Sequence, residues 1–179
     1  MRYHLGGRIL NLSRIAGDDN ALRARLRPTL EAIAQESDAT VWLAVPSGDE
    51  AAYLDIINLP DPALMGTIPR REKLEGSAVG LVFLAFVPGL GKRVLSTRAN
   101  ALNSDILPQI DTVRIKGFAL DLQTYHPGVN GVAIPWRDNG EVRASICLTG
   151  PASQLPPHRL SRLAWMLMKQ GERMDIQNC

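Results

Sequence analysis

The sequence predicts an α+β fold, a curved and largely antiparallel sheet of about six strands with helices packed on it. Two hairpin patterns carry this prediction, because strands joined by a tight turn pair antiparallel. In the stronger pattern, Asp138-Asn139-Gly140 separates two apolar runs, and Asn-Gly tolerates the positive φ angles of a hairpin turn. Stripes of apolar residues at helical spacing lie outside the hairpins and predict the covering helices.

The hairpin around Asn139-Gly140 is the expected centre of the fold. Its arms cover residues 128–136 and 141–149. Gly150-Pro151 then ends the second arm, and Pro156-Pro157 opens an amphipathic helix. Two adjacent strands with a covering helix give a surface on which the other elements can pack.

The N-terminal part predicts helices. We expect a short helix or linker over residues 3–15 and a break with N-cap candidates over residues 17–20. A helix follows over residues 20–36, which Pro28 either kinks or restarts. Its apolar stripe consists of Leu22, Leu26, Leu30 and Ile33. The alternating Arg23, Arg25 and Arg27 are expected to form a solvated face.

The next part predicts the first hairpin and a buried helix. Strands are expected over residues 40–46 and 51–58, followed by a loop over residues 59–73. Ser77 then caps a helix over residues 78–87, which is apolar nearly all round and therefore buried.

The part before the central hairpin predicts one helix and one strand. Residues 95–102 are expected to be irregular, and Asn103 or Ser104 caps a helix that ends at residue 116. Gly117 ends this helix in the left-handed conformation. A strand over residues 118–122 and a polar loop follow.

Composition describes an ordinary soluble domain. The chain has 179 residues, of which 45% are hydrophobic and 21% charged, with a net charge of +2, and it lacks the basic face of a DNA-binding module. The longest apolar run, residues 79–88, is shorter than the ~20 residues that span a bilayer. No signal-peptide pattern opens the chain, and Cys147 and Cys179 make no disulfide framework, so we expect a cytoplasmic protein.

No cofactor or metal site is expected. His4, His126 and His158 are widely separated, and no Cys-x-x-Cys pair is present. Residues 89–93 contain the Gly-Lys of a phosphate-binding loop, but the required first glycine and the hydroxyl residue after the lysine are missing, so we do not predict such a loop.

An enzyme is the alternative hypothesis. A small hydrolase or isomerase would use Asp121 and His126, with Ser145 as the nucleophile, or would pair the carboxylates of Glu75 and Asp121. A loop histidine before a proline is usually only solvated, so this hypothesis is not preferred.

Small residues gather where backbone edges should converge. Residues 77–80 open the buried helix, and a helix N-terminus presents free N–H groups to an anion. Asp121 ends a strand, and Gly131 lies on the first arm of the central hairpin. Cys147 and Thr149 are two residues apart and therefore share a face of the sheet. Such residues either leave room for a ligand or let the apolar helix pack closely.

Several stretches, in their shared order, resemble the effector-binding domain of IclR-type bacterial transcriptional regulators. The resemblance covers residues 18–176, and the most specific stretch is residues 145–153, Ser-Ile-Cys-Leu-Thr-Gly-Pro-Ala-Ser. Residues 3–10 resemble the linker helix that follows a winged helix-turn-helix in this family. The other matching stretches are residues 26–34, 40–45, 77–86, 115–121 and 128–133.

The resemblance implies a GAF-like or profilin-like domain whose pocket binds a small metabolite, often a carboxylate or an aromatic acid. It also implies homodimers or homotetramers in which ligand binding changes the placement of DNA-reading domains. Together with the cluster of small residues, it predicts a ligand site made of Glu75, Ser77, Ala78, Val79, Asp121, Val129, Gly131, Cys147 and Thr149.

The chain departs from the family pattern at three places. Residues 72–77 read Glu-Lys-Leu-Glu-Gly-Ser where Leu-Pro-Leu-His-Ala-Thr/Ser is usual, so Glu75 replaces a histidine. This carboxylate could repel a carboxylate effector, or could bind an amine or a sugar hydroxyl. Leu81 replaces the usual lysine, and Gly131 replaces a cysteine or serine.

The expected organisation is a linker-helix remnant over residues 1–16 and a ligand-sensing domain over residues 17–179. The winged helix-turn-helix is expected to be absent from this chain, and the linker-like start favours a fragment of a longer regulator. A pure dimerisation module, with its pocket filled by side chains, is a further alternative.

Overall fold

Six strands form one curled sheet in the computed structural model, which describes residues 7–59, 70–97 and 106–176. Neighbouring strands are all antiparallel in this part of the chain, in the order β3-β2-β1-β6-β5-β4. The strands are β1 (Thr40–Ser47), β2 (Glu50–Ile57), β3 (Arg71–Lys73), β4 (Ala119–Leu122), β5 (Val129–Asp138) and β6 (Glu141–Pro151). The predicted α+β fold is confirmed.

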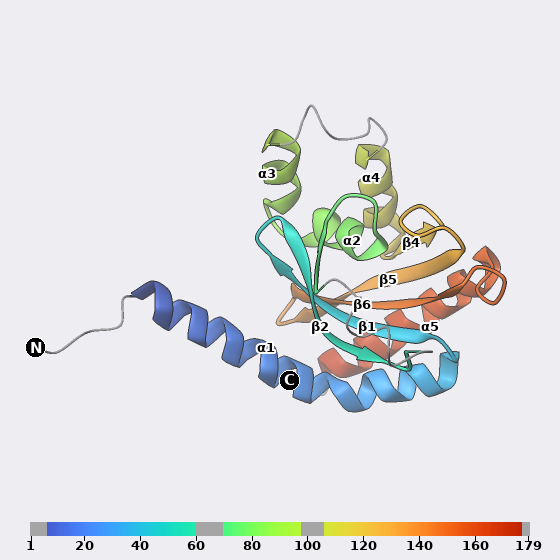
Figure 1. Ribbon diagram of the computed structural model, residues 1–179, viewed down its shortest axis with the longest axis horizontal. Helices are drawn as coiled ribbons and strands as arrows, with labels where there is room; N and C mark the ends of the chain where they lie inside the picture. Colours follow the sequence, from blue (N-terminus) through green and yellow to red (C-terminus); the bar gives the residue numbers. More distant parts are fainter. Residues whose placement is uncertain (1–6, 60–69, 98–105, 177–179) are drawn as a thin grey trace, which may run out of the picture.

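Helices cover both faces of this sheet (Figure 1). One face packs against α1 (Gly7–Ser37) and α5 (Pro157–Ile176). The other packs against α2 (Ala78–Phe86), and α3 (Leu90–Thr97) and α4 (Ile106–Lys116) pack against α2 (Figure 1). The sheet is therefore the middle of three layers, and each face has its own apolar core.

Side-chain alternation along β1 assigns residues to the two cores. Val41, Leu43 and Val45 are buried against α1 and α5, whereas Ala44 is buried on the side of α2. A small residue on the α2 side lets that apolar helix approach the sheet closely. The two sides of the sheet thus differ in side-chain size as well as in the helices that cover them.

Both predicted hairpins are confirmed. Asn139 and Gly140 have φ angles of 52° and 80°, the conformation that an Asn-Gly turn provides. Ser77 caps α2, since its Oγ accepts the Gly80 N–H at 3.1 Å. Gly117 ends α4 with φ of 82°. The proposed caps of that helix, Asn103 and Ser104, lie outside the described residues.

The predicted break over residues 17–20 is wrong, because α1 runs without interruption from Gly7 to Ser37 and includes Pro28. Each weak helix former of residues 17–20 costs about 1 kcal/mol or less. Leu26, Leu30 and Ile33 pack against the sheet and anchor the C-terminal half of α1, so extending the helix through residues 17–20 needs no new nucleus. The N-terminal half of α1 extends beyond the sheet (Figure 1).

Two elements were not predicted. Residues 71–73, expected in a loop, form the edge strand β3 on β2. Three charged residues in a row carry no apolar alternation, although charge is usual on an edge strand. Residues 95–97, expected to be irregular, end α3, whose Leu90 and Val94 are buried. Pro88-Gly89 turns the chain between α2 and α3 instead of ending the helical region.

The sequence predicts a solvated face for the arginines of α1, but in the structure these arginines form ion pairs. Arg27 donates to both carboxylate oxygens of Asp55, at 3.0 and 2.9 Å, and Arg23 lies 3.4 Å from the same carboxylate. Asp55 is only 7% exposed and raises the pKa of Arg27. Arg25 donates to Asp138 at 3.0 Å. These ion pairs tie α1 to β2 and to the end of β5.

A β-bulge makes this tie possible. Register shifts between Leu43 and Ala44 of β1, so that Leu43 faces Asp55 and Ala44 faces Tyr53. Residues two apart normally share a face of a strand. Because of the bulge, Asp55 reaches α1 while Tyr53 lies on the side of α2.

Gly80 allows α2 to touch the chain just after β3. A Cβ atom at Gly80 would overlap the carbonyl of Leu74 and lie 2.6 Å from its Cα. Leu74 is itself fully buried. Only glycine fits this contact between two backbones.

Within the described residues, no single helix has the length and apolar character needed to cross a membrane. Among these residues, α2 and α3 together reach the required length and apolar character, but a bend of 109° separates them.

We expect Gly80→Ala to lower the free energy of unfolding by about 1–3 kcal/mol, because the added methyl group overpacks against the Leu74 backbone. Urea unfolding followed by circular dichroism measures this. Helix propensity alone predicts the opposite, a gain of about 1 kcal/mol. A stabilised variant would therefore contradict the close contact.

We expect Asp55→Ala to lower the free energy of unfolding by about 1–3 kcal/mol, because it removes a buried acceptor of charged hydrogen bonds. Asp138→Ala is the matched control, since the Asp138 side chain is 30% exposed and that of Asp55 only 6%, and its effect should be about 0–1 kcal/mol. Equal effects of the two substitutions in urea unfolding would argue against a special role of Asp55.

Candidate functional site

A cavity of about 540 Å³ lies between the start of α2, the loop after β4 and one face of the sheet. Its size is typical of small-molecule sites. Eight of the nine predicted site residues line it: Ser77, Ala78, Val79, Asp121, Val129, Gly131, Cys147 and Thr149. The residues predicted from the sequence thus come from four separate elements, α2, β4, β5 and β6, and meet at one cavity.

The helix side of the cavity is the first turn of α2. Ser77 has extended backbone angles, φ −95° and ψ 152°, which let its hydroxyl turn back over the helix end. Ala78 and Val79 are buried and short, so they leave the helix N-terminus close to the cavity. Such an end carries N–H groups that favour acceptors.

The sheet side is set by strand register. Asp121 pairs with Gly131, Gly131 with Thr149, and Thr149 with Thr40, so one row of residues crosses four strands. In the next row, Cys147 pairs with Trp42. Both rows point to the same face because they are two residues apart.

Gly131 is a close-packing position rather than open space. A Cβ atom there would lie 3.2 Å from both the carbonyl oxygen of Leu148 and Cγ2 of Thr149. A serine or cysteine would therefore need Thr149 to shift by a few tenths of an ångström. Glycine keeps the Thr149 methyl group in place.

Sequence reasoning missed the aromatic wall of the cavity. Trp42 and Tyr53 line it with ring centres 5.1 Å apart, and Trp42 Nε1 donates to Thr149 Oγ1 at 2.6 Å. Tyr125, in the loop after β4, lines it as well. The available signal was the alternation of β1, which puts Trp42 on the same face as Ala44.

Glu72 is the second residue that was missed, because β3 was not predicted. It is 7% exposed and lines the cavity. Burial and the Glu72 carboxylate, by charge and by hydrogen bonding, raise the pKa of Tyr53 and of Tyr125. The predicted Glu75 is not among the lining residues, so the buried carboxylate on this side is that of Glu72.

Asp121 shapes the loop beside the cavity. Its Oδ1 accepts the backbone N–H groups of Thr124 at 2.8 Å and Tyr125 at 3.2 Å. Tyr125 in turn lies over Gly76, where a Cβ atom would be 3.8 Å from its ring. The carboxylate thus positions Tyr125 near the start of α2.

The catalytic alternative is not favoured by the positions of its residues. Ser145 is fully buried, donates to the Ile134 carbonyl at 3.0 Å and does not line the cavity. His126 is exposed and packs edge-on against Tyr125, with ring centres 4.7 Å apart. Neither arrangement activates a nucleophile.

Cys147 is a free, buried thiol in the cavity wall. Burial, with smaller contributions from Glu72 and Asp121, raises its pKa. The neutral thiol behaves as a small apolar side chain, which keeps this part of the wall apolar.

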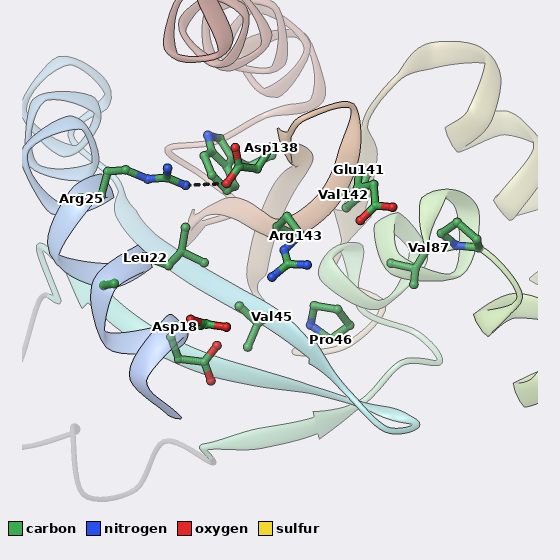
Figure 2. Close-up of a pocket in the computed structure, with 14 residues that line it drawn as sticks. Asp18, Leu22, Arg25, Val45, Pro46, Val87, Asp138, Glu141, Val142 and Arg143 are labelled. Atoms are coloured by element: carbon green, nitrogen blue, oxygen red, sulfur yellow. Dashed lines mark hydrogen bonds and ion pairs between the residues drawn. The ribbon is translucent and has the colours of Figure 1, made fainter. Parts of the chain in front are cut away.

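A second cavity, of about 650 Å³, lies between α1 and the tip of the β5–β6 hairpin (Figure 2). Arg25 and Asp138 point toward one another there, and the Arg25 guanidinium lies 4.9 Å from the centre of the Trp136 ring. Burial and the neighbouring Asp18 raise the pKa of Asp19. None of the predicted site residues lines this cavity.

Residues 16–176 match the family model described as bacterial transcriptional regulator IclR, C-terminal. Among curated relatives, a glycerol operon regulatory protein of Streptomyces griseus is 27% identical over 87% of this chain and 65% of its own length. The HTH-type transcriptional regulator KdgR of Escherichia coli is 25% identical over 98% of this chain and 68% of its own length. The chain thus spans about two thirds of these relatives.

Solved structures share the fold. The Thermotoga maritima IclR structure has a TM-score of 0.75 at 20% identity and covers 99% of this chain and 76% of its own. The C-terminal domain of E. coli KdgR has a TM-score of 0.71 at 21% identity, covering 88% of this chain and 98% of its own.

We expect Cys147 in the folded protein to react with iodoacetamide at pH 8 at least roughly tenfold more slowly than after unfolding in urea, because its raised pKa leaves little thiolate. Labelling of a Cys179→Ser variant, followed by mass spectrometry, measures Cys147 alone. Equal rates in folded and unfolded protein would show that the thiol is accessible and its pKa ordinary.

Proposed function

This chain belongs to the family of C-terminal domains of bacterial IclR transcriptional regulators, and from that premise we propose that it is an effector-binding domain. Its cavity of about 540 Å³ would hold a small metabolite, and binding would modulate DNA binding by a separate winged helix-turn-helix domain. In this proposal residues 1–16 belong to the linker helix and residues 17–179 to the sensing domain. The chain itself would be a non-catalytic, cytoplasmic sensor.

The observation that carries this proposal is the convergence of the predicted residues on one cavity. The helix start supplies Ser77, Ala78 and Val79, and β6 supplies Cys147 and Thr149. Close packing alone would have filled this space with side chains, as a pure dimerisation module requires. An open cavity with an apolar wall and a few polar groups is the usual form of a ligand site.

Self-association is the second part of the proposal. Leu107 and Ile115 of α4 and Trp165 of α5 are 54%, 87% and 66% exposed. Large apolar side chains in such positions favour contacts with another copy of the chain, as a homodimer or homotetramer.

A thermal-shift screen of small acids, sugars and amines tests the sensor. A ligand at 100 times its Kd should stabilise the protein by about 2.7 kcal/mol. Thr149→Trp, which fills the cavity, should abolish the shift, and Ala78→Leu at the helix start should weaken it.

The matched control is Thr112→Trp on the exposed side of α4, which should leave the shift unchanged. Circular dichroism checks that each variant is folded. A ligand that stabilises Thr149→Trp as strongly as the natural chain would place its site elsewhere and overturn the proposal.

A further inference from the structure

Glu72 places a buried carboxylate in the cavity with one oxygen unpartnered. The residue is 7% exposed, and its Oε1 has no hydrogen-bond partner. The hydroxyls of Tyr53 and Tyr125 interact with the same carboxylate. A buried acceptor without a hydrogen-bond partner is destabilising, and more so when it is charged. A hydrogen-bond donor on a bound molecule would satisfy it.

The charges around the cavity favour donors over anions. Among the described residues that line it, the acidic side chains are Glu72 and Asp121, the basic side chain is that of the exposed His126 in the loop after β4, and no Lys or Arg is present. Two like charges close together in a partly buried cavity repel each other strongly. A simple carboxylate near Glu72 would therefore be repelled without a cation to balance it.

The remaining walls fit a molecule with a donor at one end. The rings of Trp42 and Tyr53 offer faces that attract ammonium groups and pack against the C–H groups of sugars. At the other side of the cavity, the N–H groups at the start of α2 donate hydrogen bonds to an electronegative atom of the bound molecule. Ser77 already satisfies one N–H there, that of Gly80.

We propose that the occupant is a small molecule that donates hydrogen bonds to Glu72, through an ammonium group or through several hydroxyl groups, and that simple carboxylates are excluded. This inference rests on the proposed sensor function of the same cavity. It transfers to Glu72 the selectivity that the sequence had suggested for Glu75.

Calorimetric titration and thermal shift with three probe classes test the inference: succinate and benzoate, putrescine and choline, and glucose and inositol. Donor compounds should bind the natural chain, and the carboxylates should not. Glu72→Gln keeps the shape and removes the charge. It should weaken ammonium binding at least roughly tenfold, since charged hydrogen bonds contribute about 1.5–3 kcal/mol, and should weaken hydroxyl binding less.

Glu50→Gln is the matched control, because it removes a carboxylate from the same sheet at a half-exposed position outside the cavity. It should leave every affinity unchanged. Carboxylate binding to the natural chain that Glu72→Gln does not alter, but Thr149→Trp abolishes, would overturn the inference and leave the sensor function intact. If none of the six probes binds the natural chain, the inference fails, and the sensor function is decided by the wider thermal-shift screen.

Discussion

The backbone contact between Gly80 and Leu74 is the constraint on which the cavity depends. Gly80 lies in the first turn of α2, and Leu74 directly follows β3. Their contact therefore fixes the capped end of α2 beside the edge strand that carries Glu72. The cavity has two polar ends, the N–H groups of α2 and the carboxylate of Glu72. The close contact that glycine allows at position 80 fixes the distance between them.

Strand register provides the rest of the cavity. The row from Asp121 through Gly131 and Thr149 to Thr40 brings four strands to one face, although these residues are far apart in the sequence. A shift of one residue in β6 would send Thr149 to the opposite core. The Asn139-Gly140 turn joins β5 and β6 with two positive φ angles, and a register shift between Trp136 and Arg137 then sets the pairing of Gly131 with Thr149.

The bulge in the pairing of β1 and β2 links the cavity to α1. Tyr53 lines the cavity, and Asp55, on the opposite face, accepts the hydrogen bonds of Arg27. Tyr53 and Asp55 are two residues apart, so one short segment of β2 contacts both the cavity and α1.

The sequence by itself determined the class of fold, both hairpins, and the caps Ser77 and Gly117. Each of these follows from local chemistry: turn residues with positive φ, a hydroxyl at a helix start, and apolar periodicity. It also indicated that a carboxylate departs from the family pattern near residue 75.

Tertiary structure alone decided that Glu72 is the buried carboxylate, because β3 exists only through its pairing with β2. Helix α1 likewise continues through residues 17–20, because its C-terminal half is packed on the sheet and extending an existing helix needs no new nucleus. The aromatic wall depended on register and on a bulge, which place Trp42 and Tyr53 together by contacts between strands and not by any pattern within one strand.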